Sequence, residues 1–197
     1  MKNPLIFIIS LMIISCTSQN KIFTPQELAI INSENLILNL YTYDNEQENE
    51  LLREKSNSFN KDEIKDLTLE KLKSKMLATV KNPEHPGVGI AAPQVGILRK
   101  LIAVQRFDKE DNPFEFYINP VIVAHSDSTV VSTEGCLSVP DKKGDVIRYA
   151  SVKIEYLDND KQIKQETING FTAIIFQHEI DHLDGTLYID KIVETIE

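Results

Sequence analysis

The chain has 197 residues, of which 42% are hydrophobic and 26% are charged, a composition typical of a globular protein. Its formal net charge is −9, and no cluster of lysine and arginine stands out along the sequence. Because phosphate binding needs a basic surface, nucleic acid is not expected to be its main partner. The length suits one folded domain with a short extension.

The first 16 residues have the parts of a secretory signal: Lys2, a ten-residue apolar run from Leu5 to Ile14, and a small residue before Cys16. The run is shorter than the roughly 20 residues of a membrane-spanning helix. The segment 13–16 resembles the lipobox of bacterial lipoproteins, in which the cysteine is lipidated. Residues 1–16 are therefore predicted to be a lipoprotein-type signal, and Cys16 a membrane anchor in the cell envelope. The alternatives are an uncleaved hydrophobic anchor or a misassigned start codon, and a protein whose signal is not used would be cytoplasmic.

Two helices are predicted before the strands begin. Residues 24–27 (Thr-Pro-Gln-Glu) form a capping box with proline at the first helical position, so a helix starts there. The acidic, polar stretch 43–50 is predicted to be a loop. A second capping pattern, Asn60 with Glu63, predicts a helix whose apolar spacing continues to Val80. Two prolines just beyond Val80 end it.

In the rest of the chain, apolar and polar residues alternate as they do in strands, and a final helix follows. The predicted strands are Leu101–Val104, Phe116–Val123, Thr129–Ser132, Val152–Leu157 and Gln162–Ile168. Asp158–Asp160 has the residues of a turn, so the last two strands form a hairpin. The last helix runs from about Phe171 to Asp184 and is closed by Gly185. Helices, then strands, then one terminal helix predict an α+β fold.

The terminal helix contains the pattern H-E-x-x-H, as His178, Glu179 and His182. Residues four apart lie on one face of a helix, so both imidazoles can reach one cation. Glu179 lies about 100° around the helix from His178, close enough to act on a water at that cation. The alternative is a partly buried helix whose histidines make ordinary hydrogen bonds.

A catalytic site with two histidines needs a third ligand, and Cys136 is the best candidate. It lies between Gly135 and polar residues, and the nearby Glu134 is placed to hydrogen-bond a ligand. A lone buried cysteine is more often a small hydrophobic residue, and a disulfide with Cys16 is also open.

A glycine-rich segment, GVGIAAPQ at 87–94, is a third feature. It is a poor match to a dinucleotide-binding fingerprint, because no clear strand precedes it and Pro93 interrupts the helix that should follow. Its small residues suit a place where a substrate backbone approaches closely. Gln94 then offers an amide that can donate to a developing oxyanion.

The ordered set GVGIAAPQ at 87–94, EGCLS at 134–138 and HEIDH at 178–182 resembles the peptide deformylase family. The resemblance covers about residues 50–193, with 52–56 similar to the family's early strand-and-turn region. It implies antiparallel strands packed around a central C-terminal helix that carries HEIDH. Residues 46–197 would then be the catalytic domain, and 17–45 an N-terminal extension without a counterpart.

The resemblance also implies an activity, the removal of the N-formyl group from N-formylmethionyl peptides with release of formate. The metal ligands would be Cys136, His178 and His182, with Fe²⁺ as the usual metal and Zn²⁺, Ni²⁺ or Co²⁺ as substitutes. The implied catalytic groups are Glu179 as general base and then acid, and Gln94 and the Leu137 backbone N–H as oxyanion donors. The implied substrate-binding residues are Val88, Gly89, Leu137, Ile174 and Ile175.

Besides the N-terminal extension, two further features depart from the family's pattern. Many members carry an arginine a few residues after EGCLS, where this chain has Lys142 and Lys143, which keep the charge but lack the planar fork. The export signal is unusual for enzymes that act on nascent chains. Two other functions therefore stay open: an exported metal-dependent amidohydrolase for another N-acyl or peptide bond, and a non-catalytic lipoprotein that binds formyl peptides. The sequence does not predict an oligomeric state.

Overall fold

The computed structural model describes residues 22–193 of the chain. The helices are α1 (Pro25–Asn32), α2 (Glu46–Leu52), α3 (Leu67–Val80) and α4 (Gly170–Leu183), with 3₁₀ turns at Lys61–Glu63, Ala92–Val95 and Tyr188–Asp190. The strands are β1 (Gly89–Ala91), β2 (Leu101–Gln105), β3 (Phe114–His125), β4 (Thr129–Cys136), β5 (Val139–Tyr149), β6 (Ser151–Leu157) and β7 (Ile163–Asn169). The predicted α+β class is confirmed.

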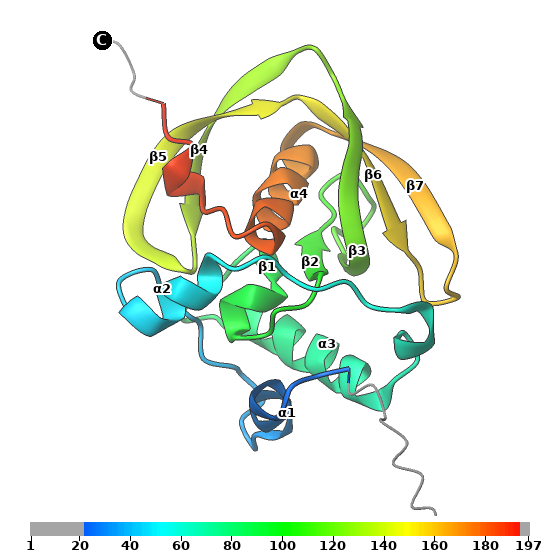
Figure 1. Cartoon of the computed structure of the whole chain (residues 1–197). Coiled ribbons are helices and arrows are strands. Elements are labelled where there is room, and N and C mark those ends of the chain that lie inside the picture. The colour runs from blue at the N-terminus through cyan, green and yellow to red at the C-terminus, as the bar shows by residue number, and fades with distance from the viewer. Residues whose placement is uncertain (1–21, 194–197) are drawn as a thin grey trace, which may run out of the picture.

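A five-stranded antiparallel sheet, in the order β1-β2-β3-β6-β7, separates two layers of helix. Helices α1 and α3 pack on one face, and α4 packs on the other, in the middle of the molecule (Figure 1). The remaining two strands, β4 and β5, form a separate hairpin beside α4. Helix α4 is therefore enclosed by strands, as the resemblance implied.

Strand β2 shows why the sheet is buried on both faces. Successive side chains of a strand point to opposite faces. Leu101 and Ala103 join the apolar cluster around α3, whereas Ile102 and Val104 join the cluster around α4. All four are fully buried, which explains why this strand reads as a continuous apolar run rather than an alternating one.

The capping pattern at residues 24–27 is confirmed as the start of α1. The Thr24 side chain accepts a hydrogen bond from the Glu27 N–H, and Glu27 accepts one from the Thr24 N–H. The described part of the predicted extension also packs on the rest of the domain, since Phe23, Ile31 and Leu38 belong to the same core cluster as α3. The predicted boundary at residue 46 stays a prediction.

Three local predictions are wrong. Residues 43–50 are not all loop, because Asn45 caps α2 and glutamates in its first turn suit the helix dipole. The capping pattern at Asn60 opens only the 3₁₀ turn, and α3 starts at Leu67 behind a second cap, Asp66. Residues 52–56 contain the end of α2 and a turn rather than a strand.

The sequence prediction also missed two strands, β1 and β5. β1 has only three residues, and β5 contains the polar run Asp141–Asp145, which hides its alternation. The predicted hairpin of β6 and β7 is confirmed, and α4 ends before Gly185, whose φ is +75°. Within residues 22–193 no helix is long and apolar enough to cross a membrane. The predicted signal and Cys16 lie outside the described residues.

Candidate metal centre and active site

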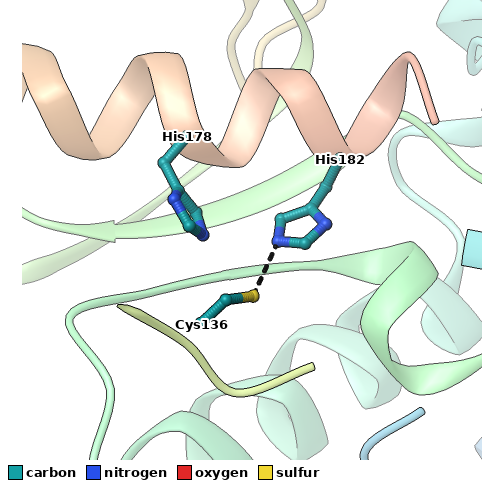
Figure 2. Close-up of side chains that lie close together, drawn as sticks. All are labelled: Cys136, His178 and His182. Carbon is teal, nitrogen blue, oxygen red and sulfur yellow. Dashed lines mark hydrogen bonds between the residues drawn. The ribbon is translucent and has the colours of Figure 1, made fainter. Parts of the chain in front are cut away.

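Helix α4 and the β4–β5 hairpin bring the three predicted metal ligands together. His178 and His182 project from one face of α4 toward Cys136, which ends β4 (Figure 2). The Cys136 Sγ lies 3.2 Å from His182 Nε2, and the ligand atoms of all three residues lie within 4.8 Å of one another. A two-residue turn after Cys136, Leu137–Ser138, closes the hairpin and sets the cysteine at its tip.

A buried carboxylate, Glu134, orients the first of the two histidines. Its Oε2 lies 2.8 Å from His178 Nδ1, so the Nε2 of that ring is left to face the cysteine. Burial would raise the pKa of Glu134, but hydrogen bonds from Arg148 and His178 outweigh it and lower the pKa to about 2. Glu134 is therefore a carboxylate at neutral pH and accepts the Nδ1 proton.

Arg148 in turn holds Glu134 in place. Its guanidinium donates to both carboxylate oxygens of Glu134, at 2.7 and 2.9 Å, and to Asp181 Oδ2 at 2.6 Å. Arg148 is only 3% exposed, and such a bidentate pair has a fixed geometry. Lys191 reaches the other oxygen of Asp181 at 2.6 Å. The arginine thus links β5, β4 and α4 behind the metal ligands.

Glu179 lies beside these ligands and is almost fully buried, with 4% of its surface exposed. Burial raises its pKa to about 7, and the nearby charge of Glu134 acts in the same direction. A carboxyl group with a pKa near 7 can both take and return a proton at neutral pH. Its Oε2 has no hydrogen-bond partner among residues 22–193, so it is free to meet a substrate or a water.

Gly89 makes room for this carboxyl group. A Cβ added at Gly89 would lie 2.3 Å from Glu179 Oε1 and 2.8 Å from its Cδ. Any larger residue would therefore displace the glutamate. The approach of a substrate backbone to the glycine-rich segment stays a prediction, and the close contact found at Gly89 is with Glu179.

Gln94 lies in the 3₁₀ turn after β1 with its amide directed at the cysteine. Its Oε1 accepts the Ala91 N–H at 2.8 Å, which orients the side chain. Its Nε2 then lies 3.4 Å from Cys136 Sγ and 3.2 Å from Ser138 Oγ. The side chain is 1% exposed, so this donor is held in a fixed, largely dry position.

The site opens into a cavity of about 730 Å³. Its wall includes Val88, Gly89, Gln94, Cys136, Leu137, Ile174, Ile175, His178 and Glu179. Every predicted site residue except His182 thus lines one cavity, and His182 lies behind Cys136 as its partner. A peptide-sized substrate has space there, with apolar residues around a few polar groups.

The donor set fits a divalent transition metal. One thiol and two imidazoles are the ligands that such cations accept, and three protein ligands leave a position for a water or a substrate. His178 has its outer nitrogen on a carboxylate, which is typical of histidines that bind a metal through the other nitrogen. Cys136 Sγ also lies 3.4 Å from the Ser138 N–H, a contact that suits a thiolate.

Sequence reasoning missed Arg148, Asp181 and Tyr188 as parts of the site. Tyr188 is 1% exposed, and its ring stacks at 6.0 Å on His178. Arg148 lies 12 residues after Cys136 in a strand that was not predicted. The signal that the sequence did offer is Asp181, which is part of HEIDH and lies in the last turn of α4.

Comparison with known proteins agrees with this geometry. The polypeptide deformylase family model matches residues 37–196. A peptide deformylase of Mesorhizobium japonicum is 40% identical over 128 residues, 64% of this chain and 72% of that protein. One of Leptospira biflexa is 36% identical over 154 residues, 75% of this chain and 85% of that protein.

Solved structures give the same result. A class I type b peptide deformylase from Acinetobacter baumannii, with the compound K3U bound, superposes with a TM-score of 0.72 at 34% identity, covering 80% of this chain and all of that one. Structures of the Acinetobacter baumannii enzyme with Met-Ala-Ser and with actinonin superpose with TM-scores of 0.70 and 0.71, both at 33% identity; they cover 79% and 81% of this chain and 98% and 100% of those chains.

These matches do not favour the two other functions that the sequence left open, hydrolysis of a different acyl bond and binding without turnover. The family match spans most of the chain and includes all three motifs. The chain therefore belongs to the polypeptide deformylase family and is a hydrolase that removes the N-formyl group from peptides.

Proposed function

We propose that Cys136, His178 and His182 hold the metal, that Glu179 transfers the protons, and that Gln94 and the Leu137 N–H stabilise the oxyanion. The supporting observation is that a pKa-shifted carboxyl group, a fixed amide donor and a Cys/His₂ cluster meet on one cavity floor. A divalent cation there would supply Lewis acidity, which activates a water and polarises the formyl carbonyl.

The residues of the chain would carry out proton transfer, oxyanion stabilisation and substrate binding. Glu179 takes the proton of the attacking water and later returns it to the leaving amine. Gln94 Nε2 and the Leu137 N–H donate to the oxygen on which negative charge develops. Val88, Gly89, Leu137, Ile174 and Ile175 line the pocket for the N-formylmethionyl peptide, whose side chain is apolar.

The experiment is formate release from formyl-Met-Ala-Ser by anaerobically purified, iron-loaded protein, beside the Glu179→Gln variant. We expect activity in the first and a loss of about 10²-fold or more in the second, with the metal content unchanged. Glu179→Gln that keeps its metal and its activity would contradict the assignment of Glu179.

Fe²⁺ is the proposed native metal, and Zn²⁺, Ni²⁺ or Co²⁺ would substitute. The mixed thiolate and imidazole set accepts all four, so the ligands alone do not select one. The Cys136 thiolate can oxidise in both forms, but only Fe²⁺ is also oxidised by air, so the iron form should lose activity faster in air than the nickel form. Equal air stability of the two forms would contradict this expected oxidation of the iron.

We also propose that the protein is exported and anchored in the cell envelope through a lipid on Cys16. The support is the signal-like order of charge, apolar run and cysteine in residues 1–16. Labelled palmitate should appear in the wild-type protein and not in Cys16→Ala. Recovery of unlabelled, full-length protein in the cytoplasm would show that the signal is not used. Its substrates outside the cytoplasm would be secreted formyl peptides.

A further inference from the structure

The rim of the substrate cavity carries two lysines in an otherwise acidic chain. Lys142 and Lys143, near the start of β5, line the cavity, and both side chains are exposed. Among residues 22–193, neither ammonium has a carboxylate within 4.0 Å. Within the described residues, neither positive charge at the rim is therefore neutralised by a carboxylate.

Burial shows which part of a substrate meets this rim. The reacting groups lie on the floor, where Gln94 is 1% and Glu179 4% exposed. Other residues of the cavity wall are exposed and apolar, with Val88 at 37% and Phe171 at 54%. A peptide whose formyl end reaches the buried floor must leave through the exposed part of the wall, to which the two lysines belong.

The two lysines are held differently. The Lys142 ammonium lies 4.7 Å from the centre of the Tyr43 ring, a cation–π contact that keeps it at the side of the hairpin. The stem of Lys143 lies along Gly135, since a Cβ added at Gly135 would be 3.6 Å from Lys143 Cγ and 4.0 Å from its Cε. Gly135 itself lines the cavity. Lys143 is thus the ammonium whose stem follows the cavity wall.

We propose that Lys143 determines a preference for formyl peptides that carry a carboxylate shortly after the methionine. The carboxylate is either an acidic side chain or the free C-terminus of a short peptide. Lys142 strengthens the local field, and Asp141, the one carboxylate that lines the same rim, weakens it. The other carboxylates in the cavity wall are the buried Glu134, paired with Arg148, and Glu179 on the floor. The inference rests on the deformylase activity and concerns which peptides are chosen.

The test compares matched substrates on the full-length enzyme. One pair is formyl-Met-Ala-Ser as free acid and as C-terminal amide, and the other is formyl-Met-Ala-Asp-amide and formyl-Met-Ala-Asn-amide. Wild-type kcat/KM should favour the charged member of a pair by about three- to fivefold at low salt, mostly through KM, as expected for an exposed ion pair. The preference should shrink at 0.5 M NaCl, because salt screens exposed charges. The first pair reports the C-terminal carboxylate, and the second an acidic side chain.

Variants assign the preference to one residue. In Lys143→Gln the ratio within each preferred pair should fall to about one, and in Lys143→Arg it should persist. Lys142→Gln should keep most of the preference. Equal rates for both members of both pairs in the wild type, or an unchanged ratio in Lys143→Gln, would overturn the proposal. Turnover of the uncharged peptides tests deformylation separately, so a failure of activity is distinguishable from a failure of this preference.

Discussion

Two arginines, Arg148 and Arg106, are buried to the same degree and do different things. Each is 3% exposed, and each is paired with more than one carboxylate. Arg148 binds Glu134 and Asp181, and through Glu134 it is connected to His178, a proposed metal ligand. In this region of the molecule the buried arginine therefore supports the proposed metal site.

The second cluster is formed by Arg106, which follows β2. It binds Asp108 at 2.7 Å, Glu166 at 2.9 Å and Glu115 at 3.1 Å, and it also contacts the Tyr117 hydroxyl. These partners come from β3, β7 and the loop after β2, and the carboxylates are 30–34% exposed. None of the partners lines the substrate cavity. Of these two arginines, Arg148 is the one that has a carboxylate partner, Glu134, in contact with a proposed metal ligand.

The largest effect should follow a carboxylate-to-amide change in the Arg148 cluster. Glu134→Gln removes the charge that accepts the His178 proton, so the metal affinity should fall by about 10- to 100-fold. Metal retention during dialysis against a chelator, with kcat/KM, measures it. Glu166→Gln, the same change beside Arg106, is the matched control and should bind metal as the wild type does. Equal metal affinity of the two variants would remove the distinction between the clusters.

A substitution at Gly89 tests the position of Glu179, the proposed general base, while both arginine clusters stay intact. Gly89→Ala places a methyl group against Glu179, so kcat/KM should fall by about tenfold or more while metal affinity is kept. Gly144→Ala is the control, since the atoms nearest to its Cβ belong to the side chain of Ile192, which is outside the cavity wall. Normal activity in Gly89→Ala would mean that Glu179 has freedom to move aside.

Arg106→Met should lower the stability of the fold without changing the catalytic activity. Removing one partner of a buried pair typically costs 3–5 kcal/mol, and partial exposure of the carboxylates should reduce this to about 2–3 kcal/mol. Denaturant unfolding measures the loss, and kcat/KM of the folded variant should stay within about twofold. A tenfold fall in kcat/KM would show that this cluster also supports the site.

Acid should weaken both arginine clusters, and the pH dependence of stability separates the contribution of one cluster from that of the other. The hydrogen bond from Arg106 holds the pKa of Asp108 below its usual value. Burial would raise the pKa of Glu115, but hydrogen bonds from Lys109 and Tyr117 lower it overall. A lowered pKa stabilises the fold above the ordinary carboxyl pKa, near 4, and this contribution is lost as pH falls through the folded value.

The thermal unfolding midpoint should therefore fall as pH drops from about 5 to about 3, and less steeply in Arg106→Met. The unfolding midpoint of the variant should still fall with falling pH, because Glu134 has a pKa of about 2 in the folded protein. Identical slopes in both proteins would contradict the assignment of acid sensitivity to the Arg106 cluster.

Local patterns predicted much of this molecule. The capping box at Thr24, the hairpin of β6 and β7 and the extent of α4 follow from turn residues, caps and spacing within a few residues of each other. One error arose where two local signals competed, whereas β1 and β5 were missed because one is short and the other contains a polar run. Asn60 and Asp66 both offer a helix cap, and only the second begins α3.

The sequence by itself determined that His178 and His182 share a face, because the helical repeat places residues four apart on one side. It also singled out Cys136, Glu179 and Gln94, through motifs that the family match later covered. The tertiary structure decided that the ligand candidate contacted by Glu134 is His178, that Gly89 makes room for Glu179, and that Arg148 rather than Arg106 supports the proposed metal ligands. Such contacts join residues far apart in the chain, and their geometry depends on how β1, the β4–β5 hairpin and α4 pack around one another.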